Sequence, residues 1–251
     1  MTGFWAIIRK EWKLYFVTPA AYVVLALFAL IAGFFFYSML AMYVMQSLGG
    51  GAFGQGSLDV NTQVLQPLFF DIGITLLFLL PMITMRTYSE ELRSGTIELL
   101  KTSPVRRMEV VLGKFLASFG LLVLLLIISA GYVAVVVHYG KPDVGALWAA
   151  FLGLALMGGT FLALGLLISS FTRNQIVAGV VTFALFLLLW VANWVTAYGG
   201  GALSGFFSYL SITSHFQNFT QGLIDVKDLV YYLSLIVGGL FLTARRMEVA
   251  E

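Results

Sequence analysis

Six long apolar stretches dominate this chain of 251 residues and restrict the folds open to it. They cover residues 22–44, 68–85, 115–137, 147–171, 176–197 and 229–244. A helix needs about 20 mostly apolar residues to cross a lipid bilayer, so we expect five stretches to span it and the short sixth to extend back past Lys227. Only 10% of the residues are charged, whereas soluble domains carry about 25%. The sequence therefore predicts an all-α polytopic membrane protein, with residues 1–251 forming a single transmembrane domain.

The residues before the first stretch predict an amphipathic helix that lies in the membrane interface. Within residues 1–20, Trp5, Ile8, Trp12 and Tyr15 share one helical face, and Arg9, Lys10 and Lys13 share the other. Such a helix places apolar side chains among membrane lipids and cations toward anionic headgroups. Glu11 is the exception, because it lies near the apolar face.

Positive charge is distributed unevenly among the segments that join the spans. Twelve of the fourteen lysines and arginines lie before the first span, between spans two and three, between spans four and five, or after the sixth. The positive-inside rule places these segments in the cytoplasm, so both termini are expected there. On the outer side, the glycine-rich residues 46–67 predict a flexible loop. Residues 198–228 are rich in aromatic side chains, which favours an external re-entrant loop of short helices.

Residues 86–114 form the one long charged segment, which we expect to be a cytoplasmic loop. A helix there would place Tyr88, Leu92, Thr96, Leu99 and Leu100 on one face and Glu90, Ser94, Glu98 and Lys101 on the other. Gly95 is expected to bend this helix, because glycine costs about 1 kcal/mol relative to alanine in a helix interior. A solvated charged loop is the simpler interpretation, but an apolar face among the charges favours a protein partner.

Several kinds of chemistry lack their sequence signatures. Neither Gly113-Lys114 nor Gly140-Lys141 has the upstream glycine and downstream Ser or Thr of a phosphate-binding loop, so we expect no ATP hydrolysis and no cofactor on this chain. The absence of cysteine and the presence of only two histidines, His138 and His215, predict neither a metal site nor a catalytic site. A formal charge of +2 gives no indication of a nucleic-acid partner.

The interiors of the predicted spans contain no charged residue and no histidine. Ion-coupled transporters place ionisable groups near the middle of the membrane, because the coupling ion binds there. Energy for transport is therefore expected from an external ATPase, for which residues 86–114 are the natural docking segment.

Small residues recur every four positions in the fourth span, at Ala155, Gly159 and Ala163. Such residues allow two helices to approach closely. The pattern predicts a helix contact with two open alternatives. Either this face packs within the subunit, or it forms a dimer interface with a second copy.

The order of several motifs relative to the six spans resembles the membrane subunit, or permease, of type-2 ABC exporters. The likeness covers nearly the whole chain and is strongest to the small single-domain branch that includes gliding-motility-associated permeases. The motifs are Arg9-Lys10-Glu11, Glu90-Glu91, Gly95-Thr96-Ile97-Glu98-Leu99-Leu100, Thr102, Pro104-Val105, Gly113-Lys114, His215-Phe216, Phe219, Gly222, Asp225 and Tyr231.

The resemblance implies a permease of an ATP-driven exporter in the bacterial cytoplasmic (inner) membrane. A coupling helix within residues 88–101 would dock on a separate ABC ATP-binding subunit, which would carry ATP and Mg²⁺. The residues implied in this contact are Tyr88, Glu90, Glu91, Leu92, Arg93, Gly95, Thr96, Glu98, Leu99 and Leu100. A second permease copy or a paralogue would complete the transporter.

Two other interpretations stay open at this point. The chain could be a non-transporting membrane scaffold that transmits ATPase motion to an envelope or motility complex. A channel or ion-coupled carrier is disfavoured, because the span interiors carry no charge.

Overall fold

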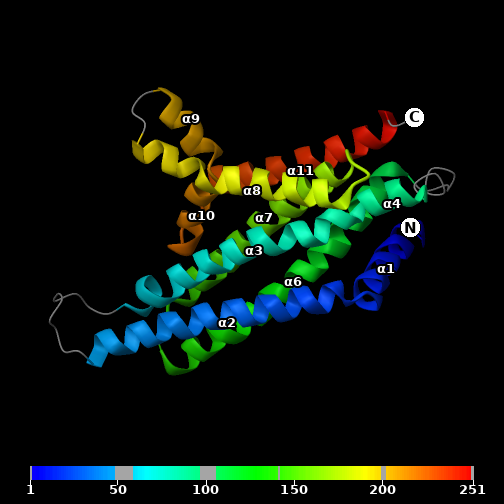
Figure 1. Ribbon diagram of the computed structural model, residues 1–251. Coiled ribbons are helices and arrows are strands. Elements are labelled where there is room, and N and C mark those ends of the chain that lie inside the picture. The colour runs from blue at the N-terminus through cyan, green and yellow to red at the C-terminus, as the bar shows by residue number, and fades with distance from the viewer. Residues whose placement is uncertain (1, 49–58, 97–105, 141, 199–201, 250–251) are drawn as a thin grey trace.

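The computed structural model describes residues 2–48, 59–96, 106–140, 142–198 and 202–249, and every regular element within them is a helix. Six of these helices are long and apolar enough to cross a membrane (Figure 1). They are α2 (Pro19–Leu48), α3 (Gln66–Thr87), α6 (Arg107–Tyr139), α7 (Val144–Ser169), α8 (Gln175–Tyr198) and α11 (Val226–Val249). The prediction of an all-α membrane protein with six transmembrane helices is thereby confirmed.

Shorter helices lie at both ends of this bundle. They are α1 (Thr2–Val17), the π-helix η1 (Asn61–Leu65), α4 (Ser89–Ser94), α9 (Ala202–Leu210) and α10 (Ile212–Thr220). Figure 1 shows α1, α4 and both chain termini at one end, which we call the terminal end. It shows α9 and α10 toward the opposite, distal end. Residues 198–228 thus contain two short helices. Of the predicted loop at 46–67, residues 49–58 lie outside the described residues, and the described part includes the end of α2, the helix η1 and the start of α3.

Helices α3 and α7 form the centre of the bundle. In their most apolar windows, 67% and 61% of the residues are buried inside the protein, compared with 17% for α2. Helix α7 packs against α3, α6, α8, α10 and α11, so nearly every face of it is covered by the chain itself. An apolar helix that is hydrophobic all round suits this central position.

Glycines along α7 allow its neighbours to approach closely. A Cβ atom built on Gly153 would lie 2.7 Å from Phe219 Cβ of α10, and one on Gly158 would lie 2.7 Å from Leu122 Cδ2 of α6. A Cβ on Gly165 would overlap the Thr84 side chain of α3. Contacts this short leave room only for hydrogen at these positions, which explains why the central helix is glycine-rich.

The small-residue face of the fourth span packs within the chain. Gly159 and Ala163 are buried. A Cβ on Gly159 would lie 3.2 Å from Ile236 Cδ1, and one on Gly239 would lie 3.3 Å from Ala163 Cβ, so α11 covers this face. Ala155 is half-buried. The proposal of these three residues as a dimer interface is therefore corrected for Gly159 and Ala163, because α7 is central rather than peripheral.

The N-terminal helix α1 packs along α6. Ile7 of α1 lies over Gly113, where an added Cβ would approach Ile7 Cγ2 to 2.8 Å. Trp12 lies over Gly120, where an added Cβ would approach Trp12 Cζ2 to 2.5 Å. Its cations Arg9, Lys10 and Lys13 are exposed. Part of the apolar face that the sequence assigned to lipid thus contacts the protein's own third span.

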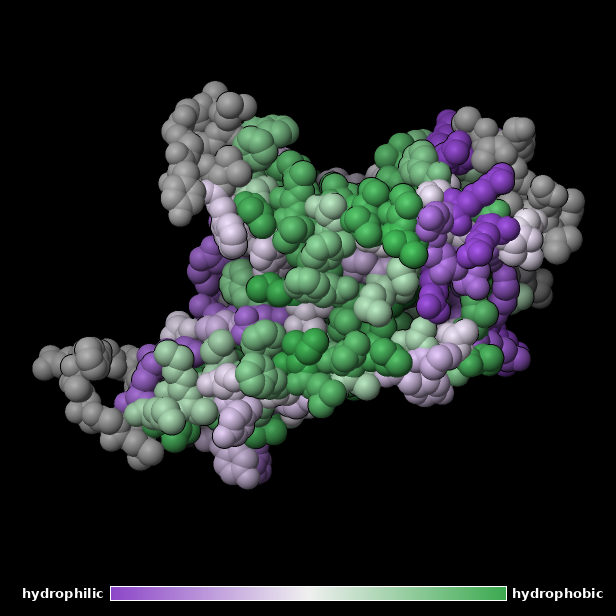
Figure 2. All heavy atoms as spheres, viewed as in Figure 1, coloured by the Kyte–Doolittle hydropathy of each residue, from purple (hydrophilic) through white to green (hydrophobic). Residues whose placement is uncertain are grey.

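Hydrophobic and hydrophilic side chains occupy different parts of the molecular surface. Figure 2 shows hydrophobic residues over the sides of the bundle and hydrophilic residues gathered at the terminal end. Large apolar side chains that face outward include Leu30 and Phe34 of α2 and Val180 of α8. A belt of this kind matches the hydrocarbon of a bilayer, in which charged groups are costly.

We predict that Gly165→Ala destabilises the protein by about 1–3 kcal/mol, because the added methyl group overlaps Thr84 and forces α3 away from α7. Chemical unfolding in detergent micelles measures this effect. Gly131→Ala is the matched control, since a Cβ at this exposed α6 position meets nothing within 4 Å. Equal effects of the two substitutions would contradict the close α3–α7 packing.

Candidate functional site

The main chain breaks its helical course between α3 and α4, and a serine from α7 compensates for the break. Ser169 Oγ accepts hydrogen bonds from the backbone N–H groups of Tyr88 (3.0 Å) and Ser89 (3.1 Å). It donates to the carbonyl oxygen of Met85 (3.3 Å), so its one donor and two acceptor positions are all used. Ser89 Oγ in turn donates to the Ser169 carbonyl oxygen (3.1 Å). The start of α4 is therefore joined to the end of the central helix.

A buried lysine joins α4 to α1 and α6. Lys114 of α6 has 1% of its side chain exposed, and its Nζ lies 2.8 Å from Glu11 Oε1 of α1 and 3.0 Å from Glu91 Oε1 of α4. It also donates to the carbonyl oxygen of Thr87 at 3.1 Å. The three donor positions of the ammonium group thus each have an acceptor. The Tyr88 ring adds a cation–π contact, with Nζ 5.1 Å from the ring centroid.

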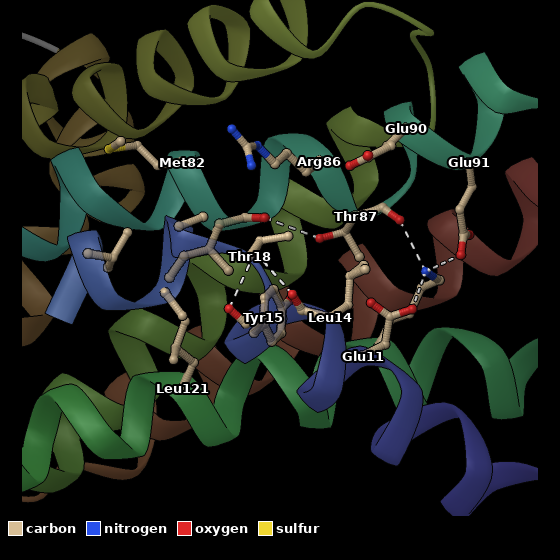
Figure 3. Close-up of a pocket in the computed structure, with 15 residues that line it drawn as sticks. Glu11, Leu14, Tyr15, Thr18, Met82, Arg86, Thr87, Glu90, Glu91 and Leu121 are labelled. Carbon is tan, nitrogen blue, oxygen red and sulfur yellow. Dashed lines mark hydrogen bonds and ion pairs between the residues drawn. The ribbon is translucent and has the colours of Figure 1, made fainter.

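A second lysine balances the charge of this group. Lys10 Nζ lies 3.0 Å from the same Glu91 Oε1 atom that contacts Lys114. We call Lys10, Glu11, Glu91 and Lys114 the lysine cluster. Two cations and two carboxylates make it formally neutral, which limits the cost of desolvating its buried members. Figure 3 shows Glu11 and Glu91 pointing toward the same place from α1 and α4.

A small cavity of about 110 Å³ lies beside the lysine cluster and is lined by residues of α1, α2, α3, α4 and α6. Its lining includes Tyr15, Arg86 and Glu90 (Figure 3). Ser118 Oγ donates to the Lys114 carbonyl oxygen, so the Tyr15 hydroxyl, 2.9 Å from Ser118 Oγ, is the donor in that contact. Burial raises the pKa of Tyr15 to about 12, so its phenol stays protonated and can donate.

Helix α4 exposes its other side at the terminal end. Glu90, Arg93 and Ser94 are exposed, and Leu92 is half-buried. The helix ends at Gly95, whose φ of 71° is the left-handed conformation that favours glycine at a helix C-terminus. The result is a short charged projection with a buried attachment and a free outer face.

A second buried polar group lies at the distal end. His215 of α10 and Asp228 of α11 are 2.6 Å apart between Nδ1 and Oδ1, and Asn218 Nδ2 donates to Asp228 Oδ2 at 2.7 Å. We call these three residues the histidine cluster. It connects the helical pair α9–α10 to the last span.

Comparison with known families identifies the chain. Residues 5–244 match the model of the family described as ABC-2 family transporter protein. The chain belongs to this family. As an ABC-2 membrane subunit it is a multi-pass permease of an ABC transporter, and it is not itself the ATPase. A search of the curated proteins found no significant match.

The structure of this ABC-2 permease divides the residues predicted to couple to an ATPase. Glu90, Arg93, Gly95 and Thr96 are exposed. Glu91 lies on the attached side, where it is used in the lysine cluster, and Leu92 is half-buried. Glu98, Leu99 and Leu100 lie outside the described residues.

Tyr88 requires a correction, because its side chain is fully buried against Lys114 rather than on an outward face. The prediction placed Tyr88 on the apolar face of a helix that bends at Gly95. The chain instead leaves its helical course at Tyr88, between α3 and α4, and the Tyr88 side chain turns into the protein. Tyr88 therefore positions α4 from within.

Sequence reasoning did not select the two clusters. One signal for the lysine cluster was present, since Glu11 lies on the apolar side of a helix where a single carboxylate is unfavourable. The histidine cluster offered less, because extending the sixth span back past Lys227 placed Asp228 near the membrane interface, where a charge is tolerated. Helix α11 begins at Val226, and Asp228 is fully buried in its first turn.

We predict that Lys114→Met lowers the free energy of unfolding by about 3–5 kcal/mol, because Glu11 and Glu91 stay buried without their shared cation. The double variant with Glu11→Gln should recover part of this loss, since Lys10 still pairs with Glu91. Denaturant titration of both variants measures the coupling. The control is Arg245→Met, whose exposed pair with Glu248 should contribute little. A small effect of Lys114→Met would contradict the cluster.

We predict that Ser169→Ala costs about 1–3 kcal/mol, because two buried backbone N–H groups lose their acceptor. Ser129→Ala is the matched control. Ser129 is also buried, but it donates only to the Leu125 carbonyl oxygen of its own helix. Hydrogen exchange at Tyr88 and Ser89 should rise in Ser169→Ala alone. Protection equal to that of the unaltered protein would disprove the role of Ser169.

Proposed function

We propose that this permease is the membrane-spanning subunit of an ATP-driven exporter and that a separate ATP-binding subunit docks on the outer face of α4. The observation that carries the proposal is the attachment of α4. It exposes Glu90 and Arg93, while buried contacts join it to α6 and α7 and, through Lys114, to α1. Family membership supports such a partner, because ABC-2 membrane subunits generally work with an ATP-binding subunit.

The attachment makes α4 suitable for transmitting force. A displacement of α4 acts on Lys114 of α6 and on Ser169 of α7 through contacts of 3.0–3.1 Å. Helix α7 then contacts α3, α10 and α11. Packed helices respond as bodies that shift between discrete arrangements rather than deforming continuously. Closure of the ATPase would thereby move several spans together and change the side to which a substrate is accessible.

The orientation and the assembly belong to the same proposal. The terminal end, with its exposed Arg9, Lys10 and Lys13, faces the cytoplasm of a bacterial cell, in agreement with the positive-inside rule. Two copies, or this chain and a paralogue, would form the membrane part, as dimers are frequent in the family. ATP and Mg²⁺ would be bound by the partner. The motif order supports a place in the branch that includes gliding-motility-associated permeases.

We predict that the double charge reversal Glu90→Lys/Arg93→Glu reduces permease-stimulated ATP hydrolysis at least about tenfold, because like charges would face the partner and each 1.4 kcal/mol lost is about a factor of ten in affinity. The assay uses vesicles that contain this chain and the ATP-binding protein that co-purifies with it. Both side chains are exposed, so folding should be unchanged.

The matched control is Lys227→Glu, an exposed charge reversal at the distal end. It should leave the stimulation of hydrolysis intact. Unchanged hydrolysis and co-purification in the α4 variant would reject α4 as the docking site. Hydrolysis that depends on α4 without any movement of solute would identify a scaffold instead of an exporter.

A further inference from the structure

The histidine cluster at the distal end is remote from α4 and has no part in the proposed coupling. His215 is 6% exposed and Asp228 is 0% exposed, and they come from different helices, α10 and α11. The chain has only one other histidine, the exposed His138 of α6. Buried ionisable groups are costly without partners, so a second buried pair, at the distal end, calls for a physical account.

The hydrogen bonds define how many protons the pair holds. His215 Nε2 lies 3.0 Å from the carbonyl oxygen of Tyr209, which can only accept, so Nε2 carries a hydrogen. His215 Nδ1 lies 2.6 Å from Asp228 Oδ1, and this contact needs a second hydrogen. A neutral imidazole has one N–H, so the arrangement is complete only with an additional proton.

Asn218 indicates where that proton resides. Its Nδ2 donates to Asp228 Oδ2 at 2.7 Å, and a hydrogen bond to the carboxylate stabilises the charged form of the aspartate. This geometry favours a proton on the ring, with the two N–H groups of His215 directed at Asp228 and Tyr209. Tyr231 stacks on this ring with centroids 4.0 Å apart, which favours a cation.

We propose that His215 and Asp228 form a proton-binding site that holds α9 and α10 against α11, and that loss of this proton releases α10. After deprotonation, only one ring nitrogen of His215 keeps its hydrogen. The other nitrogen then points a lone pair at an oxygen lone pair: Nδ1 at Asp228 Oδ1, or Nε2 at the Tyr209 carbonyl oxygen. The contact at 2.6 Å or the one at 3.0 Å is then repulsive. Release would uncover α7 where Phe219 of α10 now packs on Gly153.

The other titratable groups around His215 are three tyrosines and a surface ion pair, residue types whose usual pKa values lie far from neutral pH. The rings of Tyr209 of α9 and Tyr232 of α11 lie edge-to-face with the His215 ring at centroid distances of 5.6 and 6.4 Å, and Tyr231 is the stacked ring. Lys227 is paired with Asp225 at 3.1 Å on the surface. The neighbouring contacts of α10 with α3, α7 and α8 use Phe70, Gly153 and the Trp190 carbonyl, which do not titrate. Histidine is the side chain suited to switch between about pH 5 and 8.

The first test measures which ring nitrogens of His215 carry hydrogen, by nitrogen NMR of the imidazole ring in the full-length protein. In His138→Gln, His215 is the only histidine, so both ring signals are unambiguous. At about pH 6, where proteins commonly carry partly charged histidines, we expect hydrogen on both ring nitrogens, with loss of one at alkaline pH. A ring nitrogen without hydrogen at that acidic pH would overturn the proposal. This variant leaves every contact of the pair unchanged.

The second test measures release by amide hydrogen exchange of α10 (Ile212–Thr220), corrected for the intrinsic pH dependence of exchange. Packing of α10 against α11 is proposed to require one bound proton. The amide exchange rate of α10 should therefore rise by up to about tenfold per pH unit above the pH at which this proton is lost. His215→Gln should remove this dependence, whereas His138→Gln and Asp225→Asn, which alters the surface pair, should retain it.

A flat pH profile in the unaltered protein, or an undiminished slope in His215→Gln, would overturn the proposal. Should His215→Gln fail to fold, the NMR measurement on His138→Gln still decides the question. Both measurements use the permease without nucleotide or ATPase, so their outcome is independent of whether α4 is the docking site.

Discussion

The buried ammonium group of Lys114 is the interaction on which the terminal end of this permease depends. It lies between the carboxylates of Glu11 and Glu91. Glu11 is more than a hundred positions from Lys114 in the sequence, and Glu91 is more than twenty. At low dielectric, a charge without a partner would be far too costly to keep there, and the attraction between unlike charges is correspondingly strong. Three helices are therefore held in one arrangement by a few short contacts.

This arrangement gives α4 two different sides. The inner side is joined to α6 through Lys114 and to α7 through Ser169, and the outer side is polar and accessible. A six-residue helix has little stability of its own, because most helical stability in proteins comes from tertiary packing. Its conformation is thus imposed by the bundle, and a partner that moved α4 would act on the bundle directly.

The lysine cluster and the histidine cluster both bury ionisable side chains, at opposite ends of the protein. Each places ionisable groups inside an apolar helical body, and each combines cations and carboxylates so that little net charge is buried. They differ in what holds them. The lysine cluster consists of lysine and glutamate side chains, whereas the histidine cluster, as we propose, depends on a proton that can leave. A permanent connection at one end and a conditional one at the other would suit the proposed exporter, whose spans move relative to each other.

The apolar stretches and the distribution of cations by themselves determined that the chain is helical and crosses a membrane six times, because length and hydropathy are local properties of a segment. The motif order also predicted the family. The tertiary structure alone decided that Tyr88 turns inward, that Gly159 and Ala163 pack on α11, and that α4 ends at Gly95. It also brought Glu11 to Lys114 and His215 to Asp228. Hydropathy cannot reveal such pairs, since a buried charge is tolerated only through a partner that folding brings from elsewhere in the chain.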